Sequence, residues 1–132
     1  MWSFFNSSTI ESGVLILARI INLKTISDDR GSLSVIEKDL PFRIKRVYFM
    51  YNLSDSRGGH GHKKTIQALI SVSGSCKVHT KNKNIDKCFI LDRPDKCLIV
   101  NPEDWHIMDS FTADAVLLVL ASEYYNSADY IT

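Results

Sequence analysis

The chain has 132 residues, of which 45% are hydrophobic and 23% are charged. This length and balance are typical of one globular domain with a core of its own. The 16 basic and 15 acidic side chains leave a formal net charge of +1. Such a balance argues against partners that are held mainly by charge, so we expect no nucleic acid and no membrane partner.

The cysteines and the N-terminal segment bear on where the protein works. Cys76, Cys88 and Cys97 are spaced as in neither a disulfide framework nor a CxxC metal motif. We therefore expect reduced thiols and a cytoplasmic protein. The apolar stretch 13–21 is short and contains Arg19, so it predicts neither a signal peptide nor a membrane span. Residues 1–20 fit a short helix or an added edge strand, and we treat them as an N-terminal extension.

In chain order, a short run rich in β-branched and aromatic residues recurs, each time closed by turn-forming residues. Eight runs have this form: 32–37, 45–52, 67–73, 76–80, 88–91, 97–100, 107–109 and 115–121. No segment of 12 or more residues has the apolar spacing of a long helix. The runs predict one all-β domain over residues 21–132, built as a sandwich or a barrel.

Turn residues lie between these runs. Ser73-Gly74-Ser75 predicts a tight hairpin, and residues 81–84 predict a polar loop tip. Pro94 and Pro102 bracket the run 97–100, where a missing N–H removes no ladder hydrogen bond.

Two histidines lie in the glycine-rich segment 57–63 as His60-Gly61-His62. In extended backbone, residues two apart project to the same face, so both imidazoles point the same way. The spacing onward to Gln67 and Gly74 resembles the first cupin motif, with glutamine in place of the usual acid. His106 falls loosely where a second cupin motif supplies a third histidine. The resemblance implies a cupin, a double-stranded β-helix or jelly-roll barrel.

The glutamine bears on metal binding. Gln67 is a neutral, weak ligand, so an iron site of two histidines and one carboxylate is disfavoured. A three-histidine site of the zinc type, with His60, His62 and His106, stays open, as does a purely structural role for these histidines. Without a metal, imidazoles with pKa values of about 6.5 transfer protons near neutrality, and we assign no metal. We expect His79 to be a solvated surface residue.

A tyrosine and several cations lie near the same segments. Tyr48 follows Arg46 by two positions in a predicted strand, so their side chains share a face. A phenol near imidazoles can donate to a developing oxyanion, and a core aromatic is the structural alternative. Arg30, Arg46, Arg57 and Lys63 gather around these segments. In a nearly neutral chain, this cluster suggests an anionic ligand group such as a diphosphate.

Longer strings resemble a narrower family, the nucleotide-sugar 3,4-ketoisomerases that act on dTDP-4-keto-6-deoxyglucose. They are DRGSL at 29–33, PFRIKRVY at 41–48, RGGHGHK at 57–63, SGS at 73–75, VLASEYY at 119–125 and DYI at 129–131. The resemblance runs in register from about residue 21 to the C-terminus. It implies a small, metal-independent cupin that forms a homodimer with strands exchanged between subunits.

The resemblance also implies an activity. The family moves a ketone from carbon 4 to carbon 3, which supplies 3-amino-3,6-dideoxy sugars for surface polysaccharides such as the O-antigen of lipopolysaccharide. It implies His60 as the base at carbon 3, His62 as a second group in the proton relay, and Tyr48 as an active-site tyrosine. Gln67 and His106 join the four basic residues as substrate-binding candidates. Because imidazole can lift a proton next to a ketone when the enediolate is stabilised, we expect no cofactor.

The configuration of the product rests on two positions. Arg30 and His106 resemble the branch that gives the galacto product, whereas the gluco branch tends to carry tyrosine and arginine there. The N-terminal extension and the end at Thr132 depart from the usual family length. They leave open whether the chain is a domain cut from a larger fusion protein.

Three other functions remain as alternatives. One is a non-catalytic cupin that binds a sugar nucleotide, and another is a metal-dependent cupin enzyme that uses the three histidines. The third is a 3,5-epimerase, which shares the barrel but usually pairs its histidine with an aspartate. No such pairing is evident in the sequence.

Overall fold

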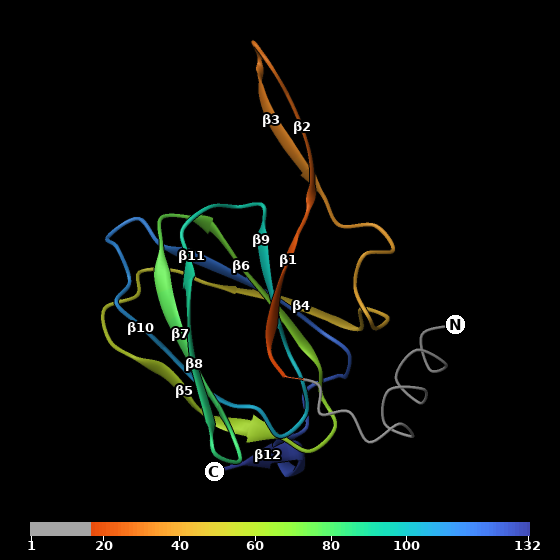
Figure 1. Ribbon diagram of the computed structural model, residues 1–132, viewed down its shortest axis with the longest axis vertical. Coiled ribbons are helices and arrows are strands. Elements are labelled where there is room, and N and C mark those ends of the chain that lie inside the picture. The colour runs from red at the N-terminus through yellow and green to blue at the C-terminus, as the bar shows by residue number, and fades with distance from the viewer. Residues whose placement is uncertain (1–16) are drawn as a thin grey trace.

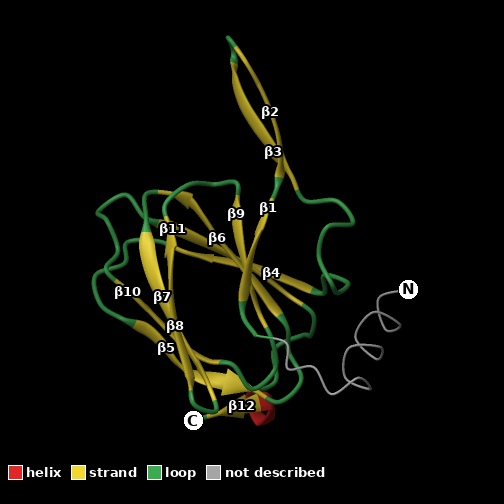
Figure 2. Ribbon diagram, viewed as in Figure 1, coloured by secondary structure: helices red, strands yellow, loops and turns green. Residues whose placement is uncertain are grey.

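A computed structural model describes residues 17–132 as strands joined by short loops (Figures 1 and 2). The strands are β1 (Arg19–Asn22), β2 (Lys24–Asp28), β3 (Gly31–Val35), β4 (Arg46–Met50), β5 (Arg57–His62), β6 (Gln67–Ser73), β7 (Cys76–Asn82), β8 (Ile85–Leu91), β9 (Lys96–Val100), β10 (Trp105–Asp109), β11 (Val116–Ala121) and β12 (Tyr130–Ile131). A short 3₁₀ helix, η1 (Ser127–Asp129), precedes β12. Residues 1–16, which hold most of the N-terminal extension, lie outside the described residues.

Two five-stranded sheets form the body of the molecule (Figure 1). One has the order β1-β9-β6-β11-β4 and the other has the order β12-β5-β10-β7-β8. The chain crosses repeatedly from one sheet to the other, and β2 pairs only with β3. Two facing antiparallel sheets with these crossings form a jelly roll. The predicted all-β cupin barrel is therefore confirmed.

Successive side chains along the central strands point to opposite faces of the sheet and enter two different apolar clusters. The larger cluster lies between the sheets and includes Leu69, Val78, Leu98 and Leu117. The second cluster covers the other face of the first sheet, where residues 68 and 70 of β6 meet leucines 23 and 40. Because both faces of β6 are covered, β6 reads as a continuous apolar run rather than an alternating one.

The connections confirm one predicted turn and correct another. Residues 81–84 form the tip of the β7–β8 hairpin, with Lys83 at φ 55°. The prediction of a tight hairpin at Ser73-Gly74-Ser75 is wrong, because β6 pairs with β9 and β11 whereas β7 pairs with β8 and β10. The segment instead turns a corner between the two sheets. Gly74 has φ 66° there, a conformation that glycine adopts without strain.

The β2–β3 hairpin projects from the body of the molecule (Figure 1). Its apolar side chains Ile26 and Leu33 face each other across the pair, and each is 56% exposed. Arg30 lies in the turn at the far end. Within the part of the chain that the structure describes, no helix has the length and hydropathy needed to cross a membrane.

Candidate active site

Three histidines meet between neighbouring strands of the second sheet. His60 and His62 come from β5, and His106 comes from β10, where its Cα is paired with that of His60. The ring centroids lie 5.2 Å apart for His60 and His62, 5.5 Å for His60 and His106, and 6.1 Å for His62 and His106. His62 and His106 are buried, and His60 is half-buried. Extended backbone and antiparallel register therefore bring all three imidazoles into one cluster.

Glycine at position 58 lets the two strands approach closely at this point. The pairing of β5 with β10 shifts register between His106 and Ile107, and Gly58 has φ 92°. A Cβ atom at position 58 would lie 3.0 Å from the backbone oxygen of His106. A side chain there would push β10 away and separate the histidines.

Asp129 of η1 holds the His62 ring. Its Oδ2 accepts a hydrogen bond from His62 Nδ1 at 3.0 Å and another from the Thr65 hydroxyl. Its Oδ1 accepts from the backbone N–H of Lys64 at 2.8 Å. Since a carboxylate only accepts, Nδ1 of His62 carries the hydrogen and Nε2 offers a lone pair. That Nε2 is buried and has no hydrogen-bond partner among the described residues. An aspartate thus pairs with a histidine here, contrary to the expectation from the sequence.

Burial keeps the imidazoles neutral near pH 7. It lowers the pKa of His60, and the neighbouring His62 lowers it further. It also lowers the pKa of His62, although the Asp129 carboxylate opposes the shift. Burial lowers the pKa of His106 to about 4. Burial alone would raise the pKa of Asp129, but hydrogen bonds from Thr65, His62 and Lys64 hold it below its usual range. The His62–Asp129 pair therefore consists of a neutral imidazole and a carboxylate.

Tyr130 borders the cluster, and Tyr48 lies near enough to Tyr130 and Arg57 for their charges to act on its phenol. Tyr130 of β12 pairs with His62 across the strands, and its ring centroid lies 4.6 Å from that of His60 and 4.5 Å from that of His62. Tyr48 of β4 is partly buried, and burial raises the pKa of its phenol. Its hydroxyl oxygen accepts from Gln67 Nε2 at 3.2 Å. The phenol hydrogen is thus left to donate to another group.

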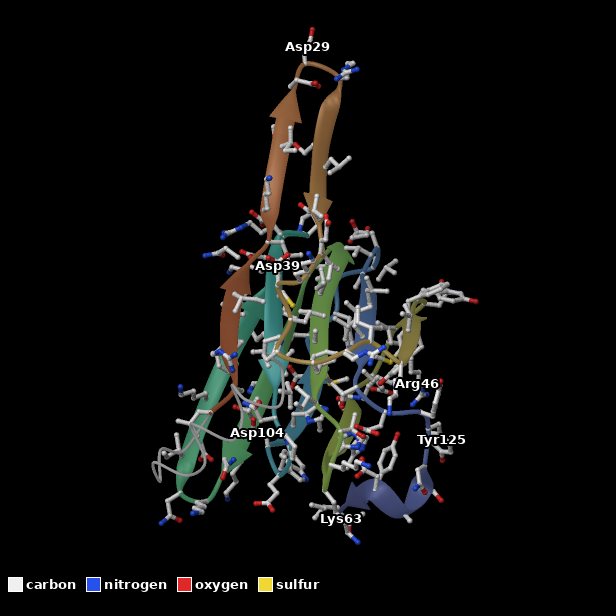
Figure 3. All side chains as sticks on the ribbon, turned by 90° about the vertical axis from the view of Figure 1, so that its right-hand side faces the viewer. Asp29, Asp39, Arg46, Lys63, Asp104 and Tyr125 are labelled. Carbon is white, nitrogen blue, oxygen red and sulfur yellow. The ribbon has the colours of Figure 1, made fainter. Side chains whose placement is uncertain are left out.

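The basic residues that were predicted to bind an anionic group lie at different positions relative to the histidine cluster. The Arg46 guanidinium lies 4.4 Å from the Tyr48 ring centroid and 5.2 Å from that of Tyr125. Figure 3 labels Arg46 and Tyr125, which lie on the same side of the molecule. Arg57 opens β5 with an exposed side chain. Lys63 follows His62 directly, and its backbone N–H donates to Asp129 O at 2.8 Å.

The expectation that Arg30 lies near the histidines is not met within one chain. Its side chain is 87% exposed and pairs with Asp28. The hairpin carries it to the end of the molecule opposite Lys63, as the neighbouring Asp29 shows in Figure 3.

The histidine cluster fits a metal ion only loosely. One ligand atom of each of the three histidines can be chosen so that all lie within 4.8 Å of one another. Nitrogen ligands of one tetrahedral zinc ion lie about 3.4 Å apart, so the rings would have to move together. Gln67 is bonded to Tyr48 and supplies no charge. We derive no catalytic step through a metal.

Sequence reasoning missed Asp129 and Tyr130 as parts of the site. Both lie in the string DYI, which contributed to the family resemblance but carried no assigned role. A local signal exists, because Asn126 precedes a short turn that is followed by the β-prone pair Tyr-Ile. Asn126 Oδ1 accepts from the Ala128 N–H at 3.0 Å and caps η1.

Comparison with known proteins identifies the family of this chain. Residues 17–132 match the family described as FdtA: WxcM-like, C-terminal. A TDP-4-oxo-6-deoxy-alpha-D-glucose-3,4-oxoisomerase from Aneurinibacillus thermoaerophilus is 46% identical over 117 residues, which cover 86% of this chain and 84% of that protein. The chain belongs to the WxcM-like family of sugar 3,4-ketoisomerases. It is an isomerase.

Solved structures of sugar 3,4-ketoisomerases are similar to most of this chain. QdtA, a sugar 3,4-ketoisomerase from Thermoanaerobacterium thermosaccharolyticum in complex with TDP, is 43% identical, with 89% of each chain covered and a TM-score of 0.85. A histidine-to-asparagine mutant of QdtA was solved in complex with TDP-4-keto-6-deoxyglucose. A 3,4-ketoisomerase from Helicobacter canadensis is 41% identical, covering 86% of this chain and 89% of that one, with a TM-score of 0.83. Two 3,5-epimerases of 14% and 16% identity share the fold alone.

Proposed function

We propose that this ketoisomerase converts TDP-4-keto-6-deoxyglucose into a TDP-3-keto-6-deoxyhexose through an enediolate. The observation that carries the proposal is the His62–Asp129 pair, with its free Nε2 beside His60. The names of the relatives, one of which acts on this 4-oxo sugar by its own name, support the choice of substrate.

The reaction moves protons and electron pairs without net oxidation. A base takes the hydrogen from carbon 3, the C–H electrons form a double bond to carbon 4, and the carbonyl oxygen becomes an oxyanion. A proton then adds to carbon 4 and another to the oxygen on carbon 4, while the hydroxyl on carbon 3 loses its proton, so that carbon 4 carries a hydroxyl and the ketone lies at carbon 3. The Tyr48 phenol can stabilise the oxyanion by hydrogen bonding. The imidazoles of His60 and His62, neutral at rest, accept these protons and return them as imidazolium ions.

The family resemblance implies His60 as the base and His62 as the second group of the proton relay. The geometry supports the reverse assignment. His62 has a carboxylate on Nδ1 and a buried, unpartnered Nε2. The carboxylate stabilises the imidazolium that forms when Nε2 takes a proton. His60 has no carboxylate partner among the described residues and is the more accessible ring. We therefore assign His62 as the base at carbon 3 and His60 as the second group of the relay.

Cations around the cluster suit the diphosphate of the sugar nucleotide. The Arg46 guanidinium lies over the rings of Tyr48 and Tyr125 and has no carboxylate partner among the described residues. Its fork of N–H groups can bind phosphate oxygens in pairs. We propose that Arg46, Arg57 and Lys63 bind the diphosphate, and that Gln67 and His106 contact the sugar.

We further propose a homodimer in which β2 and β3 cross to the partner subunit and carry Arg30 to the partner's site. Two observations support this arrangement. The hairpin extends away from its own body with apolar side chains exposed. The outward face of β4 and its end also expose Val47, Phe49 and Tyr51, each more than half accessible.

The galacto configuration at carbon 4 remains our proposal for the product, resting on Arg30 and His106. A QdtA double mutant that exchanges tyrosine for arginine and arginine for histidine was solved with TDP. These are the residue types by which we distinguish the two branches. We place the enzyme in the cytoplasm, in the synthesis of 3-amino-3,6-dideoxy sugars. The free thiols of Cys76, Cys88 and Cys97 support a reducing compartment.

The test is solvent exchange in deuterated water with TDP-4-keto-6-deoxyglucose, read by mass spectrometry. The unmodified protein should incorporate deuterium into the hexose, and His60→Asn and His62→Asn should each abolish incorporation. The surface variant His79→Asn serves as the histidine control and should leave incorporation unchanged.

Each other outcome identifies a different function. Tight TDP binding with no exchange by the unmodified protein would overturn the proposal in favour of a binding module. Near-stoichiometric metal in tag-free protein, with chelator-sensitive activity, would favour a metal-dependent enzyme.

A further inference from the structure

Asp104 is a buried carboxylate that the proposed chemistry does not use. The residue ends the loop that joins β9 to β10 and is 1% exposed. Its Oδ1 accepts from Asn82 Nδ2 at 2.8 Å, and its Oδ2 accepts from the backbone N–H of Asn101 at 2.8 Å. No salt bridge to Asp104 occurs among the described residues. A buried charge without an ion pair is costly, so its retention needs a reason.

These hydrogen bonds fix the loop 101–104 against both neighbouring strands. The Asp104 N–H donates to Asn101 O at 3.1 Å, which closes a turn. Glu103 has φ 73°, and its N–H donates to His62 O at 2.7 Å. The loop is therefore tied to β7 through Asn82 and to β5 through the backbone of His62.

The fixed loop sets the tautomer of His106. The backbone oxygen of Asp104 lies 3.2 Å from His106 Nδ1. Since a carbonyl only accepts, Nδ1 carries the hydrogen and Nε2 of this buried ring offers a lone pair. The ring lies beside those of His60 and His62. Nε2 is thus an acceptor within the proposed active site.

We infer that Asp104 and Asn82 are positioning residues that hold His106 as a hydrogen-bond acceptor for a hydroxyl group of the hexose. A ketone oxygen also only accepts, so His106 selects the hydroxyl and turns the ketone away from itself. This assignment deepens the proposed function and rests on it. His106 accepts a hydrogen bond and transfers no proton, which distinguishes it from His60 and His62.

The first test compares two replacements at position 106. The amide oxygen of His106→Gln reaches the place of Nε2 and keeps an acceptor, whereas His106→Asn reaches only the place of Nδ1. We expect the KM for TDP-4-keto-6-deoxyglucose to rise at least tenfold in His106→Asn and less than threefold in His106→Gln. Because TDP contains no hexose, its dissociation constant should be unchanged in both variants. An equal rise in KM for both variants would contradict the assignment.

The second test concerns the tautomer itself. Because the chain has four histidines, the imidazole nitrogen signals of ¹⁵N-histidine-labelled protein can be assigned with single variants. His106 should show one tautomer, with hydrogen on Nδ1. Asp104→Ala should give a mixture and raise KM as His106→Asn does. Asp104→Asn should keep the single tautomer and stay within threefold of the native KM, because an amide oxygen still accepts from Asn101 and a rotated Asn82 can accept in turn.

The controls keep the inference separable from folding and from the proposed function. Asp109→Asn changes a carboxylate that lies on β10, as His106 does, but contacts the half-buried His79 of β7, and it should change neither the His106 signals nor KM. If Asp104→Ala does not fold, Asn82→Ala takes its place with the same expected direction. A single Nδ1–H tautomer of His106 and a native KM in folded Asp104→Ala, or in the Asn82→Ala protein that replaces it, would overturn the inference. Absence of isomerase activity in native protein would refute the proposed function, whereas the tautomer measurement would still stand.

Discussion

At the scale of single residues, proton transfer depends on which nitrogen of each imidazole carries hydrogen. Asp129 fixes the hydrogen of His62 on Nδ1, and the Asp104 carbonyl does the same for His106. Both rings then offer Nε2. They differ in the group that accepts from Nδ1, which is a carboxylate for His62 and a backbone carbonyl for His106. A carboxylate stabilises an imidazolium far more than a carbonyl does. The same side chain can therefore act as a base at position 62 and as an acceptor at position 106.

Replacement of Asp129 tests the proposed role of His62. An amide at position 129 keeps the size of the side chain but loses the charge that stabilises protonated His62. We expect Asp129→Asn to lower kcat about 100-fold or more, with KM within threefold of native. The measurement is the initial rate with TDP-4-keto-6-deoxyglucose, followed by proton NMR. Native kcat in a folded Asp129→Asn protein would contradict the assignment of His62 as the base.

Burial of His106 makes stability depend on pH. The pKa of His106 is about 4 in the folded chain and about 6.5 in the unfolded chain. Between these values the unfolded state binds more protons, so the free energy of unfolding falls as the pH falls from about 6.5 to 4. The full loss from this residue is about 3 kcal/mol. His60 and His62 add to it in the same direction, since their pKa values are also lowered.

Denaturant unfolding between pH 7 and pH 4.5 measures this loss. His106→Gln should show a shallower dependence on pH than the native protein, because it removes the most strongly shifted imidazole. Identical slopes for His106→Gln and the native protein would show that the pKa of His106 is not lowered in the folded chain.

At the scale of elements, the β2–β3 hairpin carries Arg30 away from its own histidines. A mixed dimer of Arg30→Ala and His62→Asn subunits tests whether it serves the partner. If Arg30 acts in trans, one of the two sites combines intact histidines with an intact arginine. We expect the purified mixed dimer to have about half the native activity, although each variant alone is nearly inactive. Absence of activity in the mixed dimer would show that Arg30 acts within its own chain or not at all.

Elements that carry a strong local pattern were predictable, and those defined by distant contacts were not. The run 67–73 coincides with β6 because β-branched and apolar residues cover both faces of a central strand. Strand β5 was missed as a strand, since glycines and histidines have little β-propensity and its pairing with β10 sets its conformation. His62 and Asp129 are 67 positions apart, so no local pattern indicated their contact. The direction of the hairpin likewise depends on packing, which left the position of Arg30 unpredictable.

At the scale of the whole molecule, an apolar strip along the outward face of β4 suits a second copy of the chain. Val47, Phe49 and Tyr51 are 57%, 60% and 61% exposed, and contiguous apolar exposure of this kind marks interaction surfaces. We expect Phe49→Lys to convert the dimer to folded monomers in light scattering. Ile90→Lys changes a residue that is 51% exposed on the other sheet and should leave the dimer intact. Native protein that is monomeric at all concentrations would contradict the exchanged dimer.

The most direct test of the account is the proton NMR spectrum of TDP-4-keto-6-deoxyglucose incubated with the native protein in ordinary and deuterated water. We expect a 3-keto-6-deoxyhexose product in ordinary water, with the small coupling between the protons on carbons 4 and 5 that a galacto configuration gives. In deuterated water the product should carry deuterium at carbon 4. An unchanged substrate spectrum, or exchange at carbon 5 as in a 3,5-epimerase, would contradict the account.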